Sequence, residues 1–60
     1  MPRKQAYNLL KTASALVPCG IYGIEKDGYM QLMNVPMTPA EVKQKRREYG
    51  RKGIKVHYNV

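Results

Sequence analysis

The stretch from Thr38 to Gly53 constrains the fold of this 60-residue chain more than any other. Thr38 and Glu41 have the T-x-x-E spacing of a capping box, and Pro39 suits the first position of a helix. Glycines near the far end tolerate the positive φ at which helices commonly end. The stretch therefore predicts a helix over residues 39–49.

The same helix concentrates the positive charge. The chain has 11 Lys and Arg residues against 4 Asp and Glu, a formal net charge of +7. Most of the cations lie on this helix or just beyond it: Lys43, Lys45, Arg46, Arg47, Arg51, Lys52 and Lys55. Lys43, Arg47 and Arg51 fall at i, i+4 and i+8, where like charges cost roughly a few tenths of a kcal/mol per pair. A row that weakens its own helix indicates an anion outside the protein.

The acidic residues of this helix are expected to neutralise other cations. Two pairs have the favourable i,i+4 spacing: Glu41–Lys45 and Glu48–Lys52. Neither pair includes a member of the basic row, so the row is expected to keep its charge.

The N-terminal segment has a helical period. Apolar residues from Ala6 onward recur at i, i+3, i+4 and i+7, and Pro18 ends the pattern, which predicts a helix over 3–16. Arg3 and Lys4 would lie at the positive end of that helix dipole, where cations are mildly unfavourable. We therefore include both among the candidate anion-binding residues.

From residue 20 the period changes to two, which predicts a β-hairpin over 20–35. A two-residue turn would pair Lys26 with Tyr29, whereas a three-residue turn would pair Glu25 with Tyr29. The three-residue turn gathers four apolar side chains on one face: Tyr22, Ile24, Met30 and Leu32. Because the buried face sets the register, we expect the three-residue turn.

The C-terminal segment alternates cleanly and predicts a strand over 54–60. The order α-β-β-α-β then describes one α+β domain over 1–60. A right-handed crossover favours a three-stranded antiparallel sheet in the order 2-1-3, with both helices on one face. The alternative places the last strand beside the second. The sheet's other face would be a mixed surface suited to a homodimer or partner contact, with these candidate interface residues: Ile21, Tyr29, Met33 and His57.

The residue inventory argues against catalysis. One His and one Cys cannot supply the four ligands of a structural zinc site, and no phosphate-binding glycine loop is present. We expect no enzyme, no metal and no cofactor. Cys19 cannot form an intramolecular disulfide alone, which favours a reducing, cytoplasmic setting. No apolar run approaches the roughly 20 residues of a membrane-spanning helix, so no membrane partner is expected.

Dense positive charge without catalytic residues favours a polyanionic partner. We expect a small regulatory protein that binds nucleic acid, DNA or RNA, through phosphate contacts. The candidate anion-binding residues are Lys43, Arg46, Arg47, Arg51, Lys52, Lys55, Arg3 and Lys4. The alternative is a regulatory protein that docks on an acidic protein and modulates it. Phosphate contacts should weaken steeply with salt, whereas apolar burial should not.

Overall fold

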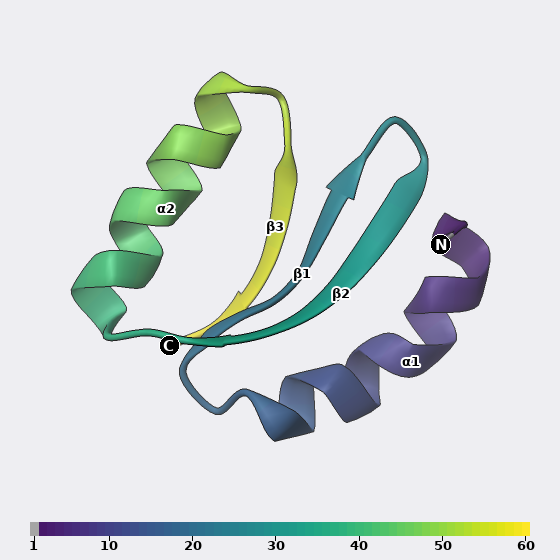
Figure 1. Cartoon of the computed structure of the whole chain (residues 1–60), viewed down its shortest axis with the longest axis horizontal. Helices are drawn as coiled ribbons and strands as arrows, with labels where there is room; N and C mark the ends of the chain where they lie inside the picture. Colours follow the sequence, from purple (N-terminus) through teal and green to yellow (C-terminus); the bar gives the residue numbers. More distant parts are fainter. Residues whose placement is uncertain (1) are drawn as a thin grey trace.

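The order of the elements follows the expectation from the sequence. The computed structural model describes residues 2–60, apart from the side chain of Arg3. Its elements are α1 (Arg3–Leu16), β1 (Gly20–Lys26), β2 (Tyr29–Pro36), α2 (Pro39–Arg51) and β3 (Lys55–Asn59). The α-β-β-α-β order is confirmed, and so is the antiparallel three-stranded sheet in the order β2-β1-β3 (Figure 1).

The two helices cover opposite faces of the sheet, so the expectation of both helices on one face is wrong. The side-chain amide of Asn59 donates to Ser14 of α1, at 3.1 Å to its carbonyl oxygen and 2.8 Å to its hydroxyl oxygen. The preceding strand residue, Tyr58, lies under the Arg46 guanidinium of α2, 4.3 Å from the ring centroid. Successive strand residues point to opposite faces. The sheet therefore separates α1 from α2, as Figure 1 shows.

α1 packs on the central strand beside Gly23. A Cβ atom added to Gly23 would lie 3.5 Å from both Leu10 Cδ2 of α1 and the Met30 sulfur. These are ordinary contact distances, so Gly23→Ala would be accommodated beside α1. The apolar period of α1 shows that the helix has a buried side, but it does not state which face of the sheet that side covers.

The hairpin register also differs from the expected one. Lys26 pairs with Tyr29 across a two-residue turn, so the three-residue turn is wrong. Asp27 (φ 54°) and Gly28 (φ 80°) both have the positive φ of a type I′ turn. Asp-Gly is preferred there because the turn's twist matches that of the flanking strands. The expected register assumed one buried face, whereas both faces of this sheet carry a helix.

A β-bulge at Tyr22 changes which residues of β1 face α2. Ile21 pairs with Tyr58 and Ile24 pairs with Val56 of β3, and the register shifts between them. Tyr58 and Val56 lie two residues apart, so they share a face. An unbroken strand would put Ile21 and Ile24, three residues apart, on opposite faces. The bulge instead places both on the α2 side of the sheet.

The buried core is small and is divided by the sheet. The buried apolar residues are Ala6, Ala13, Val17 and Met30 on the α1 side, with Ile21 and Val42 on the α2 side. α2 packs on β3 and on the adjacent part of β1. The outer strand β2 is therefore left largely open on the α2 side (Figure 1).

Candidate functional site

The capping box fixes the start of α2, and the expectation from the sequence is confirmed. The Glu41 backbone N–H donates to the Thr38 hydroxyl oxygen at 3.3 Å, and the Thr38 backbone N–H donates to Glu41 Oε1 at 3.4 Å. Pro39 occupies the first turn. Val42, fully buried, holds this turn against the sheet. The cations that follow are thus displayed on a helix whose first turn is fixed.

The basic row, Lys43, Arg47 and Arg51, lies on the exposed surface of α2. Lys43 and Arg47 line a hollow of about 390 Å³ together with Arg46. The same two residues line a second hollow of about 270 Å³ with Ala40 and Gln44. Lys43 and Arg47 are shared by both hollows, so the structure brings their cationic groups to one continuous surface.

No carboxylate neutralises this row among residues 2–60. The ion pair that forms on α2 is Lys45–Glu48, 3.4 Å between Nζ and Oε2. The expected pairs Glu41–Lys45 and Glu48–Lys52 do not form within the described side chains, because Glu41 is engaged by the capping box and Glu48 by Lys45. The acidic groups of α2 therefore leave Lys43, Arg47 and Arg51 unpaired.

Arg46 has a different position from the basic row. Its guanidinium covers the Tyr58 ring of β3, which is the arrangement of a cation–π contact. The residue remains exposed and lines one of the hollows with Lys43 and Arg47. Arg46 thus attaches α2 to the sheet and still adds its charge to the surface.

Of the remaining candidate cations, Lys4, Lys52 and Lys55 line neither hollow. Lys55 of β3 lies opposite Glu25 of β1 in the strand register, so the two side chains share a face of the sheet. Glu25 accepts a hydrogen bond at 2.9 Å from the Tyr7 hydroxyl of α1. Lys55 therefore lies on the α1 side. Lys4 is exposed near the N-terminus of α1, the side chain of Arg3 lies outside the described part of the chain, and Lys52 is exposed at the C-terminal cap of α2.

The candidate interface residues do not form one surface. Ile21 is 1% exposed and belongs to the core, so its assignment to an interface is wrong. Met33 is half-buried and lines an apolar hollow beside α1. Tyr29 is 65% exposed and is the member that remains available to a partner.

His57 lies beneath α1 and between two tyrosines. Its ring centroid is 6.2 Å from that of Tyr7 and 6.1 Å from that of Tyr22. Its Nε2 atom is buried and has no hydrogen-bond partner among the described residues. Burial lowers the pKa of His57 below 6.5, Lys55 lowers it further, and the charge of Glu25 opposes this shift. His57 is thus part of the packing rather than an open contact.

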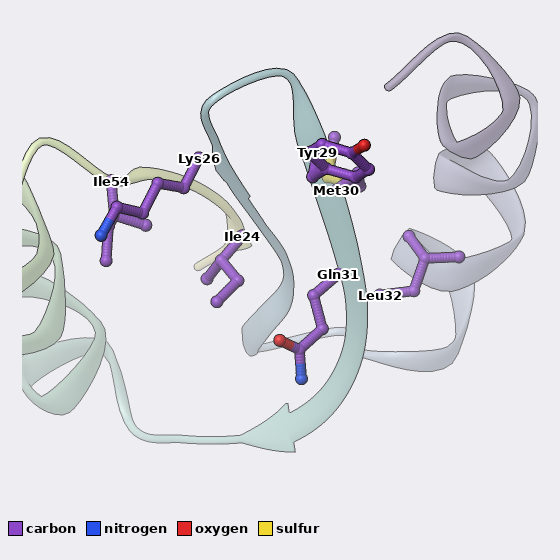
Figure 2. A pocket seen from close by; sticks show the side chains of 7 residues that line it. All are labelled: Ile24, Lys26, Tyr29, Met30, Gln31, Leu32 and Ile54. Atoms are coloured by element: carbon purple, nitrogen blue, oxygen red, sulfur yellow. The ribbon is translucent and has the colours of Figure 1, made fainter. Parts of the chain in front are cut away.

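The structure also contains a groove that the sequence did not predict. It has a volume of about 640 Å³ and lies beside the hairpin, on the part of the sheet that α2 leaves open. Ile24, Lys26, Tyr29, Gln31 and Ile54 are among its lining residues (Figure 2). Its existence depends on how far α2 extends across the sheet, which no local pattern encodes. The polar Gln31, between apolar neighbours in β2, was the one available signal.

The described residues offer few sites for other chemistry. No group of three or more His, Cys, Asp or Glu side chains comes together in residues 2–60 to hold a metal ion. Neither described helix has the length and apolar content needed to cross a bilayer. Comparison of the chain with protein-family models, with curated proteins and with solved structures gives no match.

Proposed function

We propose that this protein binds nucleic acid through phosphate contacts made by α2. The observation that carries the proposal is the exposed row Lys43, Arg47 and Arg51, without carboxylate partners among residues 2–60. Two of its members, Lys43 and Arg47, line two adjacent hollows. Unneutralised cations on one surface attract polyanions and gain binding free energy by releasing condensed counterions.

The geometry of the row suits a repeating anion. Residues four apart on a helix rise by about 6 Å along its axis, and they lie on one side of it. The row therefore presents its charges at short intervals along a line, as a phosphate backbone does. Arg46 adds a guanidinium at the Lys43 and Arg47 end, and guanidinium groups bind phosphate oxygens through paired hydrogen bonds.

Salt dependence tests this function. Affinity is measured from low to moderate salt for a random duplex DNA, a structured RNA and a DNA single strand. Log affinity should fall linearly with log salt, with a slope of about 0.9 per phosphate neutralised on a duplex and about 0.7 on a single strand. No binding to any of the three at low salt would exclude the proposed function.

Two variants of equal charge identify the face that binds. The row variant Lys43→Gln, Arg47→Gln, Arg51→Gln lowers the net charge from +7 to +4, as does the control Lys4→Gln, Lys11→Gln, Lys55→Gln. The row variant should reduce the salt slope by about 2–3, whereas the control should keep it nearly unchanged. Equal losses in both variants would show that net charge, not the α2 surface, determines binding.

One observation favours docking on a protein as a second candidate. Leu9 and Leu16 of α1 are 45% and 65% exposed, and they line an apolar hollow with Leu32 and Met33. A partner seated there would bury apolar area, and its affinity would depend little on salt. A salt-insensitive complex that is lost in Leu16→Lys would support this candidate and not the first.

A further inference from the structure

The open half of the sheet has a defined set of side chains. Lys26 pairs with Tyr29, and Ile24 pairs with Gln31, across the hairpin. Residues that pair directly, and residues two apart, share a face, so these four side chains point to the same side. Ile24 also pairs with Val56, which belongs to the α2 side. Most of the lining residues therefore lie on the same side of the sheet as the basic helix, and Met30 and Leu32 of β2 complete the lining.

The groove combines three kinds of contact. Ile24 and Ile54 give it apolar walls, and the 65% exposed Tyr29 adds an aromatic ring. Gln31 is exposed and carries both hydrogen-bond donors and an acceptor on one amide. Figure 2 shows Ile24, Lys26, Gln31 and Ile54 on the side of the hairpin away from Leu32, which points toward α1.

The charge of the groove restricts its occupant. Among the described residues that line it, Lys26 is the one that carries a charge. The acidic residues of the chain, Glu25, Asp27, Glu41 and Glu48, are all absent from its lining. With a net charge of +7 and an unneutralised helix on the same side, the chain favours an anionic ligand here.

We propose that this groove holds an unpaired nucleobase, so that the preferred ligand is single-stranded nucleic acid. This inference rests on the proposed function. A nucleobase has an apolar face that stacks on an aromatic ring and a polar edge that meets an amide. Tyr29 supplies the ring, Gln31 supplies the amide, and Lys26 is placed for an adjacent phosphate. The sugar–phosphate backbone of the bound strand then continues toward the cations of α2.

A duplex would make poorer use of this groove. Its bases are stacked on one another and paired, so no base face is available to Tyr29 unless a nucleotide is first unstacked, which costs roughly a few kcal/mol. A single strand avoids that cost. The expected ligand preference is therefore single strand over duplex, which phosphate contacts by themselves do not give.

The test uses a short single-stranded oligonucleotide with a central 2-aminopurine flanked by thymines. The fluorescence of 2-aminopurine falls when the base stacks on an aromatic ring. Wild-type protein should bind this probe and lower its fluorescence. Tyr29→Phe, which keeps the ring, should behave in the same way. Tyr29→Leu, which keeps an apolar side chain without a ring, should bind about 5- to 150-fold more weakly and lose the fluorescence change.

The fold of each variant is checked by circular dichroism, and Tyr29 is exposed enough for both changes to be tolerated. If the Tyr29→Leu variant binds the single strand as tightly as the wild type, the inference is overturned. Equal affinity for the single strand and its duplex would also overturn it. Either result leaves the proposed function standing if the row variant still loses binding. Absence of any wild-type binding would overturn both.

A charged peptide serves as the second probe. Poly-glutamate of matched length presents anionic charge without bases. It should bind weakly, and its affinity should not change in Tyr29→Leu. Binding of poly-glutamate with the same dependence on Tyr29 as the oligonucleotide would assign the groove to an acidic peptide and overturn the inference.

Discussion

α1 and α2 are held against the sheet in different ways. α1 buries the small residues Ala6 and Ala13 and is joined to β3 by the hydrogen bonds of Asn59. α2 has one buried side chain, Val42. It also contacts the sheet through the solvent-exposed cation–π stack of Arg46 on Tyr58. Close packing makes α1 the main contributor to stability. The lighter attachment of α2 leaves most of its circumference free to present charge.

This difference explains why the basic row is tolerated. Like charges four residues apart on a helix cost only roughly a few tenths of a kcal/mol when they are exposed to water. Charges at the buried positions of α1, Ala6 and Ala13, would have to be removed from water, at a far larger cost. The sheet thus separates the side that holds most of the buried residues from the side that presents the basic row.

The largest effect should follow a cavity on the α1 side. Met30→Ala should lower the free energy of unfolding by about 2–5 kcal/mol, because a side chain 1% exposed is removed. A domain of this size has roughly 3–5 kcal/mol in total, so the variant should lose a large part of its stability, measured by urea unfolding followed by circular dichroism at 25 °C. Val42→Ala on the α2 side should cost less, about 1.5–3 kcal/mol. A larger loss in Val42→Ala would contradict the comparison.

The hydrogen bonds that join β3 to α1 should come next. Asn59→Ala should cost about 1–3 kcal/mol in urea unfolding, because its amide no longer donates to three acceptors: the Ser14 carbonyl and hydroxyl oxygens and, at 3.0 Å, the Val17 carbonyl oxygen. The exposed Asn34 provides a matched control, and Asn34→Ala should change stability by less than about 0.5 kcal/mol. Equal effects of the two changes would show that the Asn59 contacts contribute little.

The attachment of α2 should be weaker than that of α1. Arg46→Ala should cost about 0.5–1 kcal/mol, because its stack on Tyr58 is exposed to solvent. Urea unfolding measures the change, with Arg46→Lys as the variant that keeps a cation. A loss from Arg46→Ala greater than that from Asn59→Ala would mean that α2 is held more firmly than its packing indicates.

Acid should lower the free energy of unfolding through His57, which lies on the α1 side. The pKa of His57 is lowered by burial and by Lys55, against the opposing charge of Glu25, and the rings of Tyr7 and Tyr22 face it. The unfolded chain therefore binds a proton more readily than the folded one. Stability should be full above pH 6.5, fall as the pH drops from there through the folded pKa, and level off below it. His57→Gln should flatten this dependence, and an unchanged pH profile would show that another group is responsible.

The smallest effect should be a gain. Removing the basic row by Lys43→Gln, Arg47→Gln, Arg51→Gln should raise the free energy of unfolding by about 0.4–1 kcal/mol at low salt, since two like-charge contacts at i,i+4 disappear. The gain should vanish at 1 M salt, where charges are screened within about 3 Å. A loss of stability at low salt would show that the row supports the fold.

Elements fixed by neighbouring residues were predictable. Thr38, Pro39 and Glu41 define the start of α2 because a capping box involves groups only three residues apart. The row Lys43, Arg47 and Arg51 could be placed on one line because the helical repeat sets the direction of each side chain. The order of the strands followed from the short hairpin and the crossover.

Features that depend on distant contacts were not predictable. The choice between a two-residue and a three-residue turn required knowing which faces of the sheet are buried. The bulge at Tyr22 interrupts the alternation of side chains along β1, so the sequence pattern did not indicate those faces correctly. Lys55 and Arg46 are close in the sequence, but they lie on opposite sides of the sheet. Lys55 faces the side that α1 covers, whereas Arg46 belongs to α2 on the other side. The candidate cations could therefore be named but not grouped.

The sequence by itself determined the two helices, the strands and the charged row, because caps, periodicity and spacing act over a few residues. Only the tertiary structure decided that α1 and α2 take opposite faces, that Ile21 is core, and that Tyr29 and Gln31 border an open groove. The physical reason is that side-chain direction follows from the local backbone, whereas exposure depends on which distant element covers that direction.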